Sequence, residues 1–179
     1  MLANKIYKEI SPELAKKMGI KNLLAVPRVE KVVVNMRISD AKEDKAVIDQ
    51  ASKELALITG QKPKICSARK SISGFKLRRG DPVGLKVTLR GKRMYDFLER
   101  LFGLAIPRLR DFRGLPLKGF DKAANYTIGF RDQIIFPEIE ADQIKKERGL
   151  EVTIVTTAKD KKESKILLES LGAVFEKEQ

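Results

Sequence analysis

The chain has 179 residues, and 42% of them are apolar, which suffices for a folded core and argues against general disorder. Its 37 lysines and arginines outnumber 24 acidic residues, and the net charge of +13 favours an acidic partner, nucleic acid before a membrane surface. Histidine is absent and cysteine occurs once, which excludes histidine-dependent nucleophiles, histidine-ligated metals, internal disulfides and multi-cysteine zinc sites.

The beginning of the chain predicts a short helix followed by a strand. Ser11 and Pro12 resemble a helix start, and Gly19 is a natural stop. The start lacks the apolar core of a signal peptide, and no run is long enough to span a membrane, so we expect a cytoplasmic protein with no membrane partner. Residues 29–38 alternate as a strand, with Val32, Val34, Met36 and Ile38 on one face and Val33, Asn35 and Arg37 on the other.

A second helix and two further strands are predicted next. Asp40 and Glu43 form a capping box ahead of a helical apolar pattern that stops at Gly60. Residues 63–68 can be extended. The segment 84–90 alternates clearly, with Leu85, Val87 and Leu89 opposite Lys86, Thr88 and Arg90.

The second half of the chain continues the mixture of helices and strands. Residues 91–103 have helical spacing, and we expect Tyr95, Phe97 and Phe102 to pack in the core. Residues 105–124 show no clear period, whereas 125–131 and 151–157 read as strands. Asp160 and Glu163 repeat the capping box before a last helix that ends near Gly172.

These elements predict one α+β domain over residues 1–179, with helices packed on one face of an antiparallel sheet and the opposite face open. A solvated face is the ordinary reading of such a pattern. The predicted open face instead gathers hydrogen-bonding and cationic side chains of one sign, namely Asn35, Arg37, Lys86, Thr88, Arg90, Thr127 and Arg131.

A basic segment stands out between residues 62 and 93. It holds eleven lysines and arginines and a single acid, Asp81, which is the electrostatic pattern of phosphate binding. Its long loop, 68–84, has no period, and we expect it to be mobile in the isolated protein because like charges repel and few apolar residues hold it. Phe75 in this loop would either stack on an exposed base or anchor the loop to the protein.

Catalytic signals are weak. Glu138, Glu140 and Asp142 could serve acid-base or metal chemistry, but their spacing is also that of a solvated edge. Cys66 has no histidine to activate it and reads as a small packed residue. A nucleic-acid-modifying enzyme that uses carboxylates near Glu138, and a basic interaction protein that binds no RNA, remain the alternatives to an RNA-binding scaffold without a cofactor.

Three long segments carry a family likeness. LITGQKPKICSARKSISGFKLRRGDPVGLKVTLRG (57–91), NYTIGFRDQIIFPEI (125–139) and GLEVTIVTTAKDKKES (149–164) resemble the ribosomal protein five family of the large subunit, bacterial branch. The likeness covers essentially the whole chain. Departures are Arg79 and Ala124, where many relatives have Glu and Gly.

The resemblance implies a curved antiparallel sheet that binds 5S rRNA and helps attach it to the central protuberance of the large subunit. It implies 5S contacts for Asn35, Gln61, Lys62, Lys64 and Thr88, to which the predicted open face adds Arg37 and Arg90. The long loop would contact peptidyl-site tRNA through Arg69, Lys70, Ser71, Lys76, Arg78 and Arg79. Further expected partners are 23S rRNA, small-subunit protein thirteen at a subunit bridge, and other central-protuberance proteins.

Overall fold

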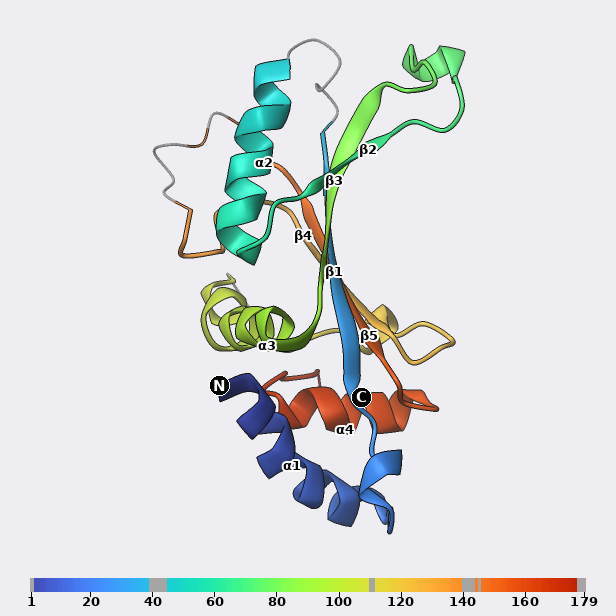
Figure 1. Cartoon of the computed structure of the whole chain (residues 1–179), viewed down its shortest axis with the longest axis vertical. Coiled ribbons are helices and arrows are strands. Elements are labelled where there is room, and N and C mark those ends of the chain that lie inside the picture. Colours follow the sequence, from blue (N-terminus) through green and yellow to red (C-terminus); the bar gives the residue numbers. More distant parts are fainter. Residues whose placement is uncertain (1, 39–44, 110–111, 140–143, 145, 177–179) are drawn as a thin grey trace. The chain divides into compact units, whose positions relative to one another are not determined.

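The computed structural model describes residues 2–38, 45–109, 112–139, 144 and 146–176. The fold is α+β, as predicted, with an open antiparallel sheet of strand order β2-β3-β1-β5-β4 (Figure 1). The strands are β1 (Val29–Arg37), β2 (Lys64–Ser67), β3 (Pro82–Leu89), β4 (Tyr126–Phe130) and β5 (Leu150–Thr156). The helices are α1 (Leu2–Met18), α2 (Lys45–Thr59), α3 (Gly91–Arg100) and α4 (Lys161–Ser170).

The chain divides into two compact units. Unit 1 comprises Met1–Val32, Leu89–Ile128 and Thr153–Gln179. Unit 2 comprises Val33–Thr88 and Gly129–Val152 and therefore contains the basic loop and most of the residues predicted to bind RNA.

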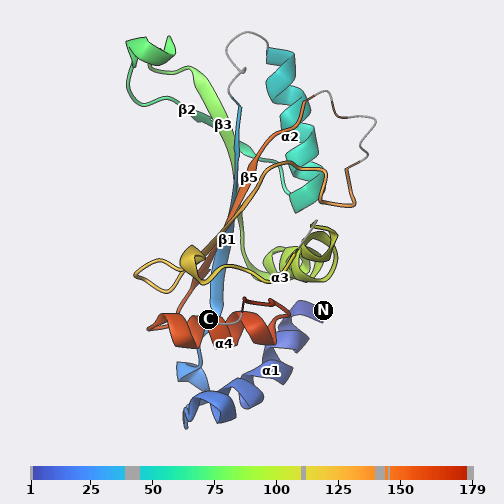
Figure 2. The ribbon, with the colours of Figure 1, turned by 180° about the vertical axis from the view of Figure 1, so that it is seen from behind.

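In unit 2, α2 lies along one side of the strands (Figures 1 and 2). Its stripe of Ile48, Ala51, Leu55 and Ile58 is buried, as are the strand residues Val34, Met36, Leu85 and Val87. The helix ends where Gly60 adopts a φ of 67°, which favours glycine. The predicted capping box at Asp40 and Glu43 lies outside the described residues.

Strands β3 and β1 approach each other closely at Gly84. A Cβ added to this glycine would lie 2.7 Å from the Met36 carbonyl oxygen, closer than real Cβ atoms come. Only glycine fits here without a shift of the backbone, because any side chain would meet a main-chain atom.

In unit 1, α1 contacts both α3 and α4. The apolar stripe of α3, with Met94, Phe97 and Leu98, continues into a π-helical segment, Leu101–Ala105. Asp160 caps α4 as predicted, since its Oδ1 accepts from the Glu163 amide at 2.8 Å.

The prediction that the first helix begins at Ser11 was wrong. The helix α1 begins at Leu2 and contains Pro12 in its interior. Proline there removes one intrahelical hydrogen bond. Pro12 is exposed, so its ring faces solvent, whereas Leu14 and Ala15 in the next turn are buried.

Candidate nucleic-acid interface

The strands of unit 2 bury one face and expose the other, as their alternation predicted. Along β1, Asn35 is half-buried and Arg37 is exposed between buried neighbours. Along β3, Lys86 is exposed and Thr88 is half-buried. Polar and cationic side chains of β1 and β3 therefore share a face that carries little apolar surface.

Strand pairing brings two lysines of this face together. Lys64 on β2 lies directly across from Lys86 on β3, and directly opposed residues point to the same side of a sheet. The Ile38 amide donates to the Val83 carbonyl at 3.0 Å, and following this antiparallel register along β1 places Asn35 on the other side of Lys86. The same registers place Cys66, Gly84 and Arg37 in the next row. We call the surface formed by Asn35, Arg37, Lys64, Cys66, Lys86 and Thr88 the open face of unit 2.

The open face has an excess of positive charge, and the described residues offer its two lysines no acidic partner. Among the residues that the structure describes, neither Lys64 nor Lys86 forms an ion pair. Like charges that lie directly opposite each other destabilise a sheet. A bound anion at this row would remove that repulsion, which is the arrangement expected of a phosphate-binding surface.

Gln61 is held beside this face by hydrogen bonds. The Thr59 hydroxyl donates to the Leu55 carbonyl at 2.7 Å and lies 3.4 Å from the Gln61 amide. The Gln61 side-chain amide donates to the Thr88 carbonyl at 3.3 Å. Gln61 thus ties the connection between α2 and β2 to β3, and its neighbour Lys62 is exposed.

Arg90 follows Thr88 by two residues in the chain, across the boundary between the two units. It belongs to unit 1 and precedes α3. Its guanidinium lies 3.6 Å from the Glu30 carboxylate, which also lies 3.7 Å from the Lys31 ammonium. Both pairs are well exposed and contribute little to stability. The remaining predicted residues all lie in unit 2.

The basic loop is a hydrogen-bonded hairpin rather than an irregular segment. Ile72 and Leu77 exchange two backbone hydrogen bonds of 2.8 and 3.0 Å, and Ala68 bonds with Asp81 and Gly80 nearer the strands. At the tip, Ser73–Phe75 form a 3-10 turn, and Lys76 adopts a left-handed conformation with a φ of 49°. We call residues 68–81 the basic hairpin; in Figure 1 it extends from β2 and β3 in green.

Two polar side chains organise the basic hairpin. The carboxylate of Asp81, its only acid, accepts from the Arg78 amide at 2.8 Å. The Ser71 hydroxyl accepts from the Arg79 amide at 3.0 Å. The predicted tRNA-contacting cations are all exposed, namely Arg69, Lys70, Lys76, Arg78 and Arg79.

Apolar side chains accompany these cations. Phe75 is 73% exposed and Ile72 is 46% exposed, so Phe75 is not buried as an anchor. Together with Leu77 and Arg69 they line a groove of about 570 Å³ that Arg37 also borders. An exposed ring beside arginines suits base stacking.

A further basic pocket in unit 2 was not predicted from the sequence. Lys146 and Arg148 line one pocket with Arg37, although they lie more than a hundred residues away in the chain. The basic residues of KKERG (145–149) are visible in the sequence. They follow the acidic residues 138–142 closely, and for that reason they did not stand out as a basic cluster.

The carboxylates that the enzyme alternative would use are described only in part. Glu138 is half-buried, while Glu140 and Asp142 lie outside the described residues. Within the described part of the chain, no group of three or more His, Cys, Asp and Glu side chains could hold a metal ion. No described helix is long and apolar enough to cross a membrane.

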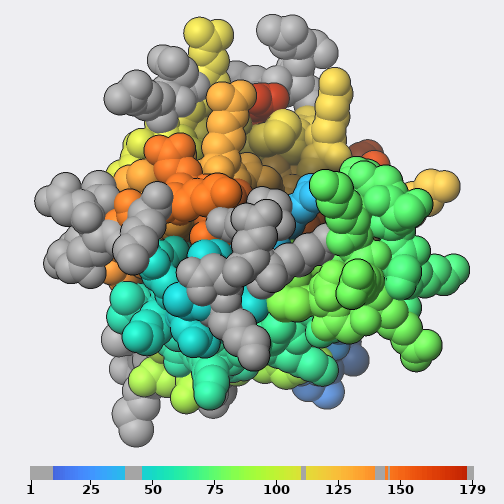
Figure 3. Space-filling view, turned by 90° about the horizontal axis from the view of Figure 1, so that it is seen from above, coloured from blue at the N-terminus to red at the C-terminus, as the bar shows by residue number. Residues whose placement is uncertain are grey.

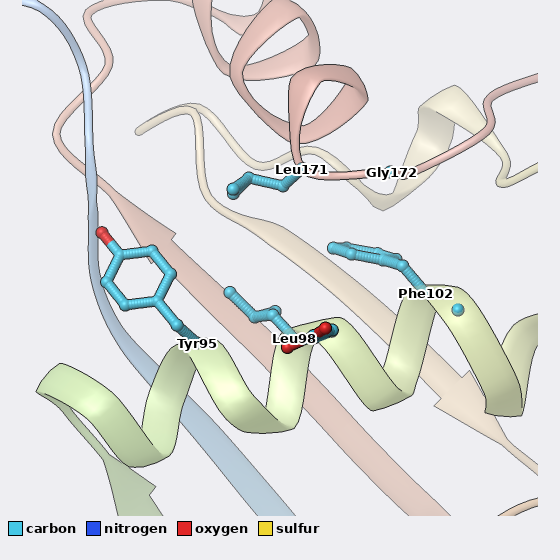
Figure 4. A pocket seen from close by; sticks show the side chains of 7 residues that line it. Tyr95, Leu98, Phe102, Leu171 and Gly172 are labelled. Atoms are coloured by element: carbon cyan, nitrogen blue, oxygen red, sulfur yellow. The ribbon is translucent and has the colours of Figure 1, made fainter. Parts of the chain in front are cut away.

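Unit 1 has an apolar pocket of about 220 Å³ between α3 and the end of α4. Figure 4 shows Leu98 of α3 and Phe102 of the following π-helical segment projecting toward Leu171, with Tyr95 one turn before Leu98. Phe97 and Phe102 are buried, as predicted, while Tyr95 is only half-buried and forms part of the pocket wall. Among the residues described, the only charged side chain that lines this pocket is Glu99, so the lining contains no group of residues that could act together in catalysis.

Similarity to known proteins extends over both units of the chain. A family model described as ribosomal protein L5 matches residues 22–78, and a second model, described as the C-terminus of that ribosomal family, matches residues 82–175. The large ribosomal subunit protein uL5 of Thermus aquaticus is 54% identical over 98% of this chain and 97% of its own length. Its counterparts from Thermus thermophilus and Shewanella piezotolerans are 52% and 51% identical, each over 98% of this chain and at least 97% of their own length.

Proposed function

Because the chain belongs to the ribosomal protein L5 family, we propose that the open face of unit 2 binds 5S rRNA and helps attach it to the central protuberance of the large ribosomal subunit. Family membership makes the protein a structural constituent of the large subunit that acts in translation in the cytoplasm. A structural role, without catalysis, follows from the same membership.

The observation that carries the proposal is the row Lys64, Lys86 and Asn35 on the open face. It combines two opposed ammonium groups with a neutral amide. Lysines and Arg37 supply the salt-sensitive attraction to phosphates, while Asn35, Gln61 and Thr88 bond base edges, sugar hydroxyls or phosphates. Lys62 extends the charge beside Gln61. Arg90 would contribute only after exchanging its pairing with Glu30 for RNA.

The basic hairpin has a separate proposed partner, the elbow of peptidyl-site tRNA. Its exposed cations Arg69, Lys70, Lys76, Arg78 and Arg79 would contact tRNA phosphates, and Ser71 would keep the tip in shape through the Arg79 amide. Contacts with 23S rRNA, with small-subunit protein thirteen and with neighbouring central-protuberance proteins belong to the same proposal, without assigned residues.

Titration of fluorescently labelled 5S rRNA at several salt concentrations tests the open face. We expect Asn35→Ala and Thr88→Ala each to weaken binding by about 1 kcal/mol with little change in the salt dependence. Lys64→Gln should reduce the slope of log affinity against log salt by about 0.7 to 0.9, the amount expected for one phosphate contact.

Three results would contradict the proposal. Absence of retention of the wild-type protein on immobilised 5S rRNA at physiological salt would favour a basic protein that binds no RNA. Equal losses of 5S affinity from Arg78→Ala with Arg79→Ala and from the sheet variants would contradict the division between sheet and hairpin. Intact labelled RNA after incubation is expected, and cleavage abolished by Glu138→Ala would favour the enzyme alternative.

A further inference from the structure

A second basic pocket lies in unit 2, formed by residues distant in sequence. Arg37, Lys146, Glu147, Arg148 and Gly149 line a cavity of about 450 Å³. Three of these side chains are cationic and one is acidic, so the lining carries a net positive charge. Lys146 is exposed and Arg148 is half-buried.

The Gln133 side chain fixes the backbone of this pocket through hydrogen bonds. It is completely buried, and its side-chain oxygen accepts from the Arg148 amide at 2.6 Å. Its side-chain nitrogen donates to the Lys146 carbonyl at 3.0 Å and to the Glu54 carboxylate at 3.3 Å. One side chain therefore fixes the main chain on both sides of Glu147 and links it to α2.

Gly149 is the last residue of the segment 146–149 that lines the pocket. A Cβ at this position would lie 3.4 Å from the Phe130 carbonyl oxygen and 3.7 Å from that of Arg131. The main chain at Gly149 thus lies within van der Waals contact distance of the end of β4. The pocket backbone is held in place before any ligand arrives, which lowers the entropy cost of binding.

The pocket adjoins the open face through Arg37, which lies in the row of Cys66 and Gly84. Arg37 also borders the groove of the basic hairpin. In the space-filling view, the end of β1 in blue is seen between the hairpin in green and the segment before β5 in orange (Figure 3). An RNA strand bound to the open face would therefore reach Lys146 and Arg148 without leaving the positive surface.

We propose that Arg37, Lys146 and Arg148 bind a phosphodiester group of the RNA that occupies the open face, and that Gln133 is a positioning residue for this site. The inference rests on the proposed function above. Guanidinium groups match phosphate oxygens with two parallel hydrogen bonds, and a lysine adds a point charge. The acidic surface of a partner protein is the competing ligand, and it would not follow the salt dependence of RNA.

The test compares variants in titrations of labelled 5S rRNA over a range of salt. Arg148→Gln and Lys146→Gln should each reduce the log-log salt slope by about 0.7 to 0.9. The matched control is Lys162→Gln, which removes the same charge from the exposed surface of α4 in unit 1 and should leave the slope unchanged. Gln133→Met, which removes no charge, should also lower the slope because it releases Lys146 and Arg148.

The outcomes separate the two proposals. A wild-type protein that fails to bind 5S rRNA overturns the proposed function and this inference together. Wild-type binding that Asn35→Ala weakens, with slopes for Arg148→Gln and Lys146→Gln equal to that of Lys162→Gln, overturns the phosphate pocket alone. A normal slope for Gln133→Met, with reduced slopes for the two charge variants, refutes only the positioning role, and circular dichroism verifies that each variant is folded.

Discussion

The Lys64 and Lys86 pair shows how a single row of a sheet can favour binding at the expense of stability. The two ammonium groups oppose each other across β2 and β3, and no described acid pairs with them. Cross-strand pairs change stability by roughly 0.2 to 1 kcal/mol, and like charges do so unfavourably. The free protein therefore keeps a repulsion that bound phosphate would relieve.

Lys86→Gln should consequently move stability and binding in opposite directions. We expect the free energy of unfolding in urea to stay level or rise by a few tenths of a kcal/mol, since the repulsion is lost. The salt slope of 5S binding should fall by about 0.7 to 0.9. A variant that loses stability, or that binds with the wild-type slope, would show that Lys86 serves the fold rather than the ligand.

Gly84 offers a prediction about packing alone. Gly84→Ala would place a methyl group 2.7 Å from the Met36 carbonyl oxygen, and the required backbone shift should cost about 1 to 3 kcal/mol of unfolding free energy. Gly129→Ala in β4 is the control, because nothing lies within 4 Å of its added Cβ. Equal unfolding midpoints for the two variants would mean that the strands separate without cost.

At the scale of elements, the basic hairpin keeps its shape with very little apolar burial. Two backbone hydrogen bonds between Ile72 and Leu77 stabilise the hairpin in place of apolar packing. The hydrogen bond that the Asp81 carboxylate accepts from the Arg78 amide adds to them. The expected mobility of this segment stays a prediction. The hydrogen bonds refine it, because the amides of Arg69 and Lys70, for which the described residues provide no acceptor, should exchange faster than those of Ile72 and Leu77.

Asp81→Ala should loosen the turn at residues 78–81, at the base of the basic hairpin. Removing the acceptor at 2.8 Å should speed hydrogen exchange of the Arg78 amide, whereas Asp81→Asn keeps an oxygen and should change it less. Exchange measured by NMR on the free protein would report both. An Arg78 amide that exchanges at the unfolded rate in the wild type would remove the basis for this assignment.

The turn before β4 makes stability depend on pH. The Asn125 side-chain amide, which donates to Asp121, lowers the pKa of that carboxyl below its ordinary 3.8, and the backbone amides of Asn125 and Ala123 add to the effect. Protons therefore bind more weakly to the folded protein than to the unfolded chain. The stabilisation is present above pH 3.8 and is lost as pH falls through the lower, folded value.

Urea unfolding of the wild type and Asp121→Asn between about pH 6 and about pH 2.5 checks this dependence. The wild type should be the more stable protein at the upper end, and the difference should shrink on acidification. A constant difference across the range would show that the carboxylate charge has no part in the turn.

At the scale of the whole molecule, the alternation of β1, β3, β4 and β5 predicted which face of the sheet is buried, because side chains in a strand point to opposite sides in turn. The pairing of Lys64 with Lys86 was not predictable, since it depends on strand register. Neither was the pocket of Arg37, Lys146 and Arg148, because tertiary packing alone brings these residues together.

Other differences have equally specific causes. No regular structure was predicted for the basic hairpin, because its many cations interrupt any apolar alternation. The short β-bridge between Ile72 and Leu77 therefore leaves no pattern in the sequence. Ala124, which stands where many relatives have glycine, adopts a left-handed conformation with a φ of 59°. The Asp121 carboxylate bonds to the amides on both sides of that residue, which compensates an unfavourable conformation for alanine.

Cys66 is the only thiol of the chain, and it lies opposite a residue without a side chain on the open face. A maleimide fluorophore attached there would lie on the open face, in the same row as Arg37. Its emission would report the arrival of RNA at this row without any engineered substitution, and unlabelled competitor would reverse the signal. The protein thus carries its own attachment point for following ribosome assembly in real time.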